Sequence, residues 1–243
     1  MNTSPIAADA LSYINHGWSV VPVPYRSKKC LTKGWSTLRL TANDVPTYFN
    51  GSRSNIGVLP GEPSGWRVDV DMDVEEAVVA GCRLLPATNL IHGRVSNPES
   101  HRWYHVSGPV KSQEWEFTEA GSDKPTMIIE LRANGRQTLV PPSLHPEGEQ
   151  YRWEREGMPG EVTPDDLTRR VGQVAAAALI ARHWPGKGTR DKAAMALAGL
   201  LLRASWSDED IDSFVSLVSI CARDEEHSSR EKATAASSSM ASR

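Results

Sequence analysis

The sequence predicts an α+β fold in two parts, followed by a short tail. Residues 1–158 alternate between short strand patterns and two helical patterns, whereas residues 163–236 contain helical patterns only. The last seven residues, 237–243, are poor in apolar side chains and are expected to be disordered. A chain of 243 residues is long enough to bury the core that such a fold requires.

The elements of the first part follow from the spacing of its apolar residues. Residues 4–17 have the spacing of an amphipathic helix that stops at Gly17, and residues 74–85 predict a helix of three turns. Strands are expected where short apolar runs are bounded by turn residues, at 18–24, 55–61, 65–73, 100–106, 126–132 and 137–142. The last of these must end at Pro141 and Pro142, because proline cannot donate a ladder hydrogen bond.

The second part begins with a clear helix start. Thr163 is a good N-cap, Pro164 suits the first helical position, and Asp165 lies in the first turn. Apolar stripes predict helices at 163–184, 189–204, 207–226 and 228–236. The segment 154–162, rich in Gly, Pro and Glu, is expected to link the two parts.

Composition excludes several classes of protein. No apolar run approaches the roughly 20 residues of a membrane span, and the N-terminus does not have the basic-then-apolar pattern of a secretory signal. The three cysteines lie far apart, so no zinc site is expected and a reducing cytoplasm is favoured. The net charge of −3 does not by itself indicate a nucleic-acid-binding protein.

One loop departs from this acidic balance. Residues 26–39 contain five basic side chains, including Lys28, Lys29 and Lys33, and no acidic ones. Such a loop is either simply solvated or faces phosphate groups.

The stretch Trp66–Asp73, "WRVDVDMD", has an unusual pattern for a strand. Because strand side chains alternate, Asp69, Asp71 and Asp73 share one face, where like charges repel. A water-facing surface would tolerate this row. A bound Mg²⁺ or Mn²⁺ would also explain it, because these ions prefer oxygen ligands.

Two further groups of polar residues lie on predicted strands. His101 and His105 share a face of the strand at 100–106, where a structural role is the ordinary alternative. Glu130 follows a buried apolar run, and Arg132 shares its face. A Glu and an Arg at this spacing also occur as a simple surface ion pair.

The order of these motifs resembles the bifunctional DNA primase/polymerase family of the archaeo-eukaryotic primase superfamily, common on phages and plasmids. The matching motifs are Gly17–Pro22, Lys33–Trp35, Asn55–Val58, Ser64–Asp71, Ser100–His101, Glu130–Arg132, Pro142–Gly148 and the pair Tyr151 and Trp153. The resemblance implies an RRM-like palm with an N-terminal α/β unit, followed by a small helical module. The turn before His101 reads "NPES" where the family often has a Gly-rich turn.

The resemblance also implies a role for each site residue. It assigns Asp69, Asp71 and Glu130 to two Mg²⁺ or Mn²⁺ ions, and His101 to catalysis and to the phosphates of the nucleotide. We further expect Arg132, Ser143 and His145 to contact the triphosphate, and Lys28, Lys29 and Lys33 to face DNA. Asp73 is expected to support the ligands or to lie at the surface.

The predicted function is template-dependent synthesis of primers and DNA by nucleotidyl transfer. The expected partners are a single-stranded or primed DNA template, NTP or dNTP, and a helicase domain or subunit beyond Arg243; no membrane is involved. Two alternatives stay open. A rolling-circle nuclease would need a His-x-His pair and a nucleophilic Tyr on a helix, and a non-catalytic DNA-binding protein could keep the same fold.

Overall fold

The structure is a computed structural model that describes residues 5–50 and 53–224. The helix expected at 228–236, the end of the predicted helical module and the predicted tail at 237–243 lie outside the described residues. The described part contains six α-helices, two short 3₁₀ helices (η1, Trp35–Thr37, and η2, Glu62–Ser64) and ten strands. The α+β fold class is confirmed, with antiparallel sheets and a helical C-terminal part that fit a primase palm.

A seven-stranded sheet forms the centre of the molecule. Its order is β6 (Gln113–Thr118), β7 (Pro125–Arg132), β3 (Arg67–Met72), β5 (Asn97–Val106), β4 (Leu90–Arg94) and β9 (Arg152–Glu156), and β10 (Gly160–Val162) also pairs with β5. All pairs are antiparallel except that of β10 with β5. Strand β3 therefore lies inside the sheet, with β5 on one side and β7 on the other.

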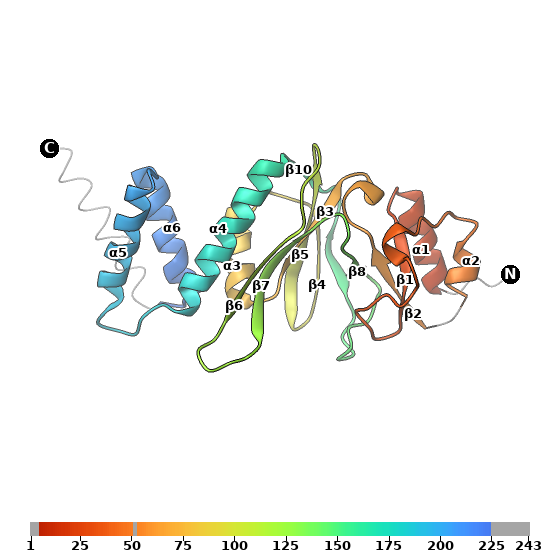
Figure 1. Cartoon of the computed structure of the whole chain (residues 1–243), viewed down its shortest axis with the longest axis horizontal. Helices are drawn as coiled ribbons and strands as arrows, with labels where there is room; N and C mark the ends of the chain where they lie inside the picture. Colours follow the sequence, from red (N-terminus) through yellow and green to blue (C-terminus); the bar gives the residue numbers. More distant parts are fainter. Residues whose placement is uncertain (1–4, 51–52, 225–243) are drawn as a thin grey trace.

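A smaller sheet covers one face of the large one. It consists of β1 (Val20–Pro24), β2 (Ser54–Val58) and β8 (Thr138–Val140), all antiparallel. Helices α1 (Pro5–Asn15) and α2 (Val45–Tyr48) lie on its outer side (Figure 1). Ile6 and Ala10 of α1 and Val45 of α2 are buried with Ile56 of β2 and with Trp103 of the large sheet, so this unit has its own apolar core.

Helices cover the other face of the large sheet (Figure 1). Helices α3 (Glu75–Leu84) and α4 (Pro164–Arg182) pack directly on the sheet, α6 (Asp208–Cys221) packs on α3 and α4, and α5 (Arg190–Arg203) packs on α6. The expected cap of α4 is present, because the Thr163 side chain accepts a hydrogen bond from the Asp166 backbone N–H. Ser207 caps α6 in the same way through the Asp210 N–H.

Strand β3 separates its two kinds of side chain as its alternation predicts. Val68, Val70 and Met72 are fully buried in the core beneath the helices. Asp69 and Asp71 are also buried, on the opposite face toward the small sheet. The strand is thus covered on both faces, and the acidic row is not a water-facing surface over most of its length.

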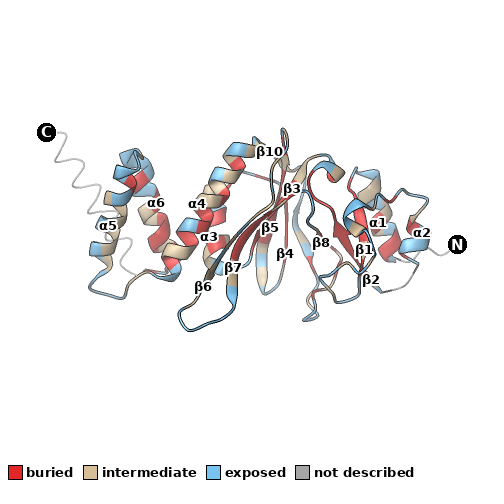
Figure 2. Cartoon of the chain, viewed as in Figure 1, coloured by how far each residue is buried: buried red, intermediate tan, exposed pale blue. Residues whose placement is uncertain are grey.

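The C-terminal helices share this core rather than forming one of their own. Leu167 and Val174 of α4 and Phe214 of α6 belong to the same buried cluster as Val70 and Ile129 of the sheet. Helix α5 is peripheral, with Leu201 as its buried residue (Figure 2). The segment expected as a linker forms part of β9 and all of β10. A domain division between residues 158 and 163 stays a prediction.

Within the described residues, none of the helices is both long enough and apolar enough to cross a membrane.

The shared core predicts how the molecule unfolds. Leu167→Ala should lower the free energy of unfolding by about 2–5 kcal/mol, because a fully buried leucine leaves a cavity. Leu202→Ala is the matched control, because Leu202 is 59% exposed on α5. Urea unfolding followed by tryptophan fluorescence and by circular dichroism checks this. Two separate transitions, with only one shifted by Leu167→Ala, would mean that the helices unfold independently of the sheet.

Candidate active site

The strand register brings the predicted charged residues into one row across the sheet. Asp71 of β3 lies opposite Glu130 of β7 on one side and opposite His101 of β5 on the other. Residues directly opposite on neighbouring strands have Cβ atoms only about 4.5–5.5 Å apart. This register forms because Val68, Val70, Ile129 and Leu131 must face the helical core together.

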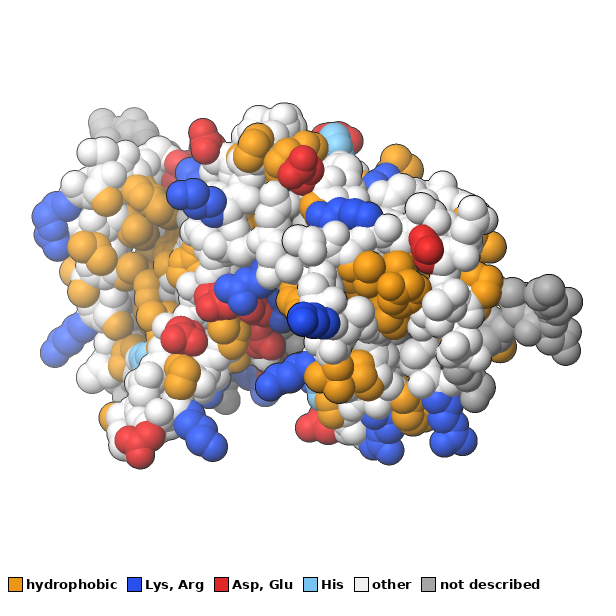
Figure 3. Space-filling view, turned by 45° about the vertical axis from the view of Figure 1, so that its right-hand side comes forward, with side chains coloured by type: hydrophobic (Ala, Val, Ile, Leu, Met, Phe, Trp, Pro, Cys, Tyr) orange, Lys and Arg blue, Asp and Glu red, His pale blue; other side chains and the backbone are white. Residues whose placement is uncertain are grey.

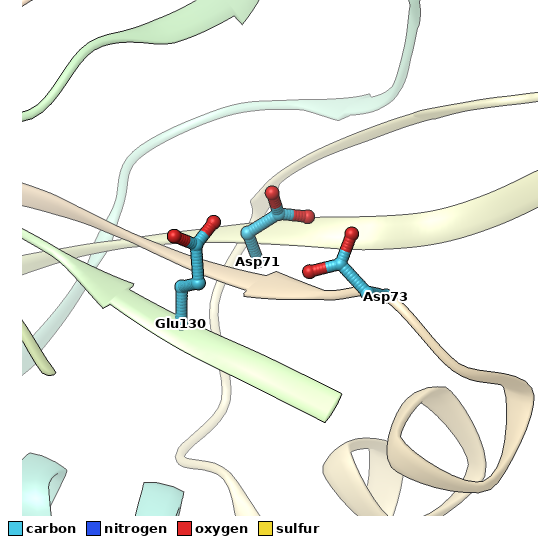
Figure 4. A group of neighbouring side chains, drawn as sticks. All are labelled: Asp71, Asp73 and Glu130. Atoms are coloured by element: carbon cyan, nitrogen blue, oxygen red, sulfur yellow. The ribbon is translucent and has the colours of Figure 1, made fainter. Parts of the chain in front are cut away.

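Three carboxylates converge at one end of this row. Among the described residues, Asp71, Asp73 and Glu130 each offer an oxygen such that these atoms lie within 4.8 Å of one another. Figure 4 shows the three side chains rising from the same side of β3 and β7. Asp73 follows the end of β3 and is exposed, whereas Asp71 and Glu130 are buried. Three hard oxygen donors at this separation suit a divalent cation such as Mg²⁺ or Mn²⁺.

Arg132 neutralises part of this charge. Its Nη2 lies 2.7 Å from Asp71 Oδ2 and also contacts Glu130 Oε2, to which its Nε donates at 2.7 Å. Burial acts to lower the pKa of Arg132, but Asp71 and Glu130 raise it above its usual value, so the guanidinium stays charged. Arg132, which was expected to contact the triphosphate, is thus paired with the carboxylates of Asp71 and Glu130.

Asp69 takes a different position from the other two aspartates. It is fully buried, and its Oδ2 accepts from Thr138 Oγ1 of β8 at 2.8 Å and lies 3.0 Å from His101 Nδ1. Its Oδ1 has no hydrogen-bond partner in the described part of the chain. The structure therefore does not bring Asp69 into the carboxylate group, where Asp73 stands instead. The predicted role of Asp69 as a metal ligand stays a prediction that this geometry does not favour.

His101 is held between two carboxylates. Its Nδ1 faces Asp69, and its Nε2 lies 3.5 Å from Asp71 Oδ1. Burial acts to lower the pKa of His101, but the negative charges of Asp71 and Asp69 raise it above 6.5. Because both ring nitrogens face acceptors, the cationic imidazolium is the form that this site stabilises.

A second histidine, His92, packs against the ring of His101. His92 of β4 stacks on His101 with ring centroids 4.2 Å apart and ring planes within 4°. Trp103 Nε1, which can only donate, gives a hydrogen bond to His92 Nδ1, so the His92 proton is on Nε2, 3.0 Å from the Leu139 carbonyl. Burial and the charge of His101 hold the pKa of His92 well below its usual value, so this ring is neutral.

A small cavity of about 90 Å³ opens beside these groups. Its lining includes Asp71, Asp73, His101 and Arg132 together with Lys28 and further residues from β4, β5 and β8. Desolvation of the Asp73 carboxyl by the groups around it and the charge of Asp71 raise the pKa of Asp73 to about 7. Burial acts to raise the pKa of Asp71 as well, but the positive charges of Arg132 and His101 keep it below its usual value. The cavity thus combines acceptors for a cation with donors for an anion.

The remaining predicted residues lie around this cavity at different depths. Lys28 lines it, whereas Lys29 and Lys33 are exposed on the same loop. Ser143 is buried, and its hydroxyl accepts from the Ile56 N–H at 2.9 Å, which joins the loop after β8 to β2. His145 packs on Tyr151 and accepts from the Glu147 N–H. These contacts of Ser143 and His145 fit a structural role, and their predicted contact with nucleotide stays a prediction.

Sequence reasoning missed several residues of the cavity. They include Arg94, Asn97, Ser100, Gln137 and Tyr151. Asn97 fixes the end of β3 by donating to the Met72 carbonyl at 3.0 Å, and Arg94 is paired with Glu149 at 2.9 Å. Arg94 ends β4 and Asn97 begins β5, in a segment where no strand was expected. Ser100 and Tyr151 stand in matched motifs, and those motifs were the available signal.

The fold and the site define a palm-type α+β protein with a candidate divalent-cation site on its central sheet. Residues 10–167 match the family model of the bifunctional DNA primase/polymerase, N-terminal domain, and the chain belongs to this family. A comparison with curated proteins finds no match. Membership implies a metal-dependent DNA primase or polymerase of the nucleotidyltransferase type, which acts on nucleotides and a DNA template.

The buried contact between Asp69 and His101 predicts how Asp69→Asn changes the pKa of His101. Loss of the carboxylate charge should lower the pKa of His101, because Asp69 is one of the two anions that raise it. Titration of the His101 ring by NMR, in EDTA, measures this directly. The stabilisation from a raised histidine pKa is complete below pH 6.5 and is lost as the pH rises through the folded pKa. The stability gap between wild type and Asp69→Asn should therefore be largest near pH 6 and shrink toward pH 9.

Thr138→Val provides the control, because it removes a hydrogen-bond donor to the same Asp69 oxygen and leaves the carboxylate in place. It should lower stability by about 1–3 kcal/mol, and by the same amount at pH 6 and at pH 9. An unchanged His101 pKa in Asp69→Asn would show that the two side chains do not interact as described.

Proposed function

We propose that this chain synthesises primers and extends DNA by nucleotidyl transfer at Asp71, Asp73 and Glu130. The observation that carries the proposal is the convergence of these three carboxylates within 4.8 Å, on two neighbouring strands, beside a cavity with basic residues. The match of residues 10–167 to the primase/polymerase family supports the same reaction.

The donor set fits the metal ions that this chemistry needs. All three ligands are carboxylates, no sulfur or neutral imidazole is among them, and their mutual repulsion would be relieved by a cation. Asp71, Asp73 and Glu130 would hold one or two Mg²⁺ or Mn²⁺ ions. When bound, such ions activate the attacking 3′-oxygen and neutralise the charge that develops on the leaving pyrophosphate.

The protein's own cations would bind and orient the triphosphate. Arg132 is positively charged, the two carboxylates beside His101 favour its imidazolium form, and Lys28 lines the cavity from the N-terminal loop. Arg132 offers a planar fork suited to phosphate oxygens. His92 keeps the His101 ring in place by stacking, and Asp69 fixes its Nδ1. Such fixed groups lower the cost of aligning the nucleotide with a primer end.

The placement of the nearest tyrosine does not support a rolling-circle nuclease. Tyr104, the tyrosine nearest to His101 in sequence, is fully buried on the helical side of the sheet, and its hydroxyl donates to the Pro86 carbonyl at 2.9 Å. It therefore faces away from the carboxylates. A non-catalytic DNA-binding role would not require the three converging carboxylates.

The test is nucleotide incorporation by the full chain on primed and unprimed templates, in Mg²⁺ and in Mn²⁺. Asp71→Asn, Asp73→Asn and Glu130→Gln should each reduce incorporation by at least about 100-fold. Loss of one metal ligand removes several kcal/mol of transition-state stabilisation, and about 1.36 kcal/mol corresponds to tenfold in rate. Glu116→Gln, an exposed acid on β6, should leave the rate unchanged.

A second readout does not depend on turnover. Titration of Mn²⁺ followed by electron paramagnetic resonance should show weakened binding in the same three variants and unchanged binding in Glu116→Gln. Near-normal synthesis by Asp71→Asn would contradict the proposed reaction. Full activity of Asp73→Asn together with a dead Asp69→Asn would return the ligand role to Asp69.

A further inference from the structure

The N-terminal unit carries a charge opposite to that of the rest of the chain. Residues 10–61 contain six Lys or Arg and a single acid, Asp44, whereas the remaining residues contain 21 Lys or Arg and 29 Asp or Glu. The Asp44 carboxylate is already occupied, because it accepts from the Thr41 N–H at 2.8 Å and from the Thr41 hydroxyl at 2.6 Å. The positive charge of this unit is therefore not cancelled locally.

Two of the six basic residues are engaged with backbone carbonyls, Arg26 in the loop between β1 and η1 and Arg39 just after η1. Arg26 donates through Nε and Nη2 to the Pro146 carbonyl at 3.2 and 2.9 Å, and Arg39 donates to the carbonyls of Ser36 and Leu38. Ser27 turns the loop by accepting from the Lys29 N–H at 3.0 Å. The backbone that carries the lysines is thus fixed by hydrogen bonds.

The other four basic residues are accessible to solvent. Lys28, Lys29, Lys33 and Arg53 are exposed, and none forms an ion pair with a carboxylate within residues 5–50 and 53–224. Figure 3 shows Lys and Arg side chains at the lower right, on the side of the molecule that carries β1 and β2. An unpaired cluster of this kind creates a positive potential that attracts a polyanion.

An aromatic side chain lies within this cluster. Tyr25 is 42% exposed, and the Arg53 guanidinium lies over its ring, 5.7 Å from the centroid. Leu31, on the same loop, is 75% exposed. Basic side chains with an exposed aromatic ring are the combination that binds unpaired bases along a phosphate backbone, because every base has a face that can stack. A duplex hides those faces.

The cluster is continuous with the candidate active site through one residue. Lys28 lines the cavity that contains Asp71 and Asp73, whereas Tyr25, Lys29, Lys33 and Arg53 are not among its lining residues. The basic surface thus begins at the cavity, with Lys28, and extends outside it. A single triphosphate at the carboxylates would not need the basic residues outside the cavity, but a longer strand that leaves the site along this loop would.

We propose that Tyr25, Lys29, Lys33 and Arg53, the basic loop surface, bind single-stranded DNA and guide the template strand past Lys28 to the carboxylates. The lysines and Arg53 contact phosphates, and Tyr25 stacks on a base. The identity of the strand as template rests on the proposed function, whereas binding of single-stranded DNA to this surface does not.

The test measures binding of a fluorescein-labelled 20-nucleotide oligo-dT to the full chain by anisotropy, in EDTA and without nucleotide, from 50 to 200 mM NaCl. Lys29→Ala/Lys33→Ala should weaken binding at least tenfold at 100 mM salt. It should also reduce the slope of log K against log salt by about 1.4, since each single-strand phosphate contact contributes about 0.7. Tyr25→Ala should weaken binding by about tenfold with an unchanged slope, because stacking releases no counterion.

The matched control is Lys111→Ala/Lys124→Ala, which removes the same charge from two exposed lysines next to β6 and β7. It should bind as wild type does, and melting temperatures should show that all variants are folded. Equal loss in this control, or equally tight binding of a duplex of the same length by wild type, would overturn the proposal. So would an unchanged affinity in both loop variants.

Two further arms separate this proposal from the proposed function. Lys29→Ala/Lys33→Ala should bind dATP in Mn²⁺ as wild type does, and weakened dATP binding would assign the two lysines to the nucleotide instead. Asp71→Asn should bind oligo-dT normally. If Asp71→Asn were active but the loop variants still lost oligo-dT, only the proposed reaction would fail. If Asp71→Asn were inactive and the loop variants bound normally, only this inference would fail.

Discussion

The structure depends on the burial of carboxylates inside a β-sheet. Strand β3 is covered by helices on one face and by the small sheet on the other, so water can solvate the carboxylates of Asp69 and Asp71 very little. A buried charge is tolerated when it is paired and hydrogen-bonded. Arg132, His101 and Thr138 provide that pairing from β7, β5 and β8, which lie on three different sides of β3. The site is therefore also a junction that ties the two sheets together.

This junction determines where the rest of the chain must lie. Thr138 can reach Asp69 only because β8 pairs with β2, and that pairing places the N-terminal unit over the acidic face. The Ser143 hydroxyl and the Asn55 side chain continue the attachment, since they bond to the backbone of β2 and of Leu144. As a result the basic N-terminal unit borders the acidic row, and opposite charges meet at the cavity that Lys28 lines.

Sequence patterns predicted the parts of the fold in which side-chain alternation or helical spacing is strong. The apolar face of β3 and the capped helices α4 and α6 are examples. Strands β6, "QEWEFT", and β9, "RWERE", were missed because they carry polar side chains on their solvent faces and few apolar ones. Strand β4, "LIHGR", contains Gly93, which weakens the strand signal. Helical spacing shows that α4 has an apolar face but does not show which surface that face covers, so the packing of α4 on the sheet could not be predicted.

The sequence could place the three aspartates on one face of β3 but could not predict how deeply each of them is buried. Alternation puts Asp69, Asp71 and Asp73 on one side of β3, yet their depth is set by what covers each position. Thr138 and His101 enclose Asp69, Asp71 lies between His101 and Arg132, and Asp73 extends past the strand end into the open cavity. Exposure thus increases along the row from Asp69 to Asp73. A solvated cation would have access only at the open end of the row, where Asp71 and Asp73 lie, whereas Asp69 contacts His101 in the closed interior.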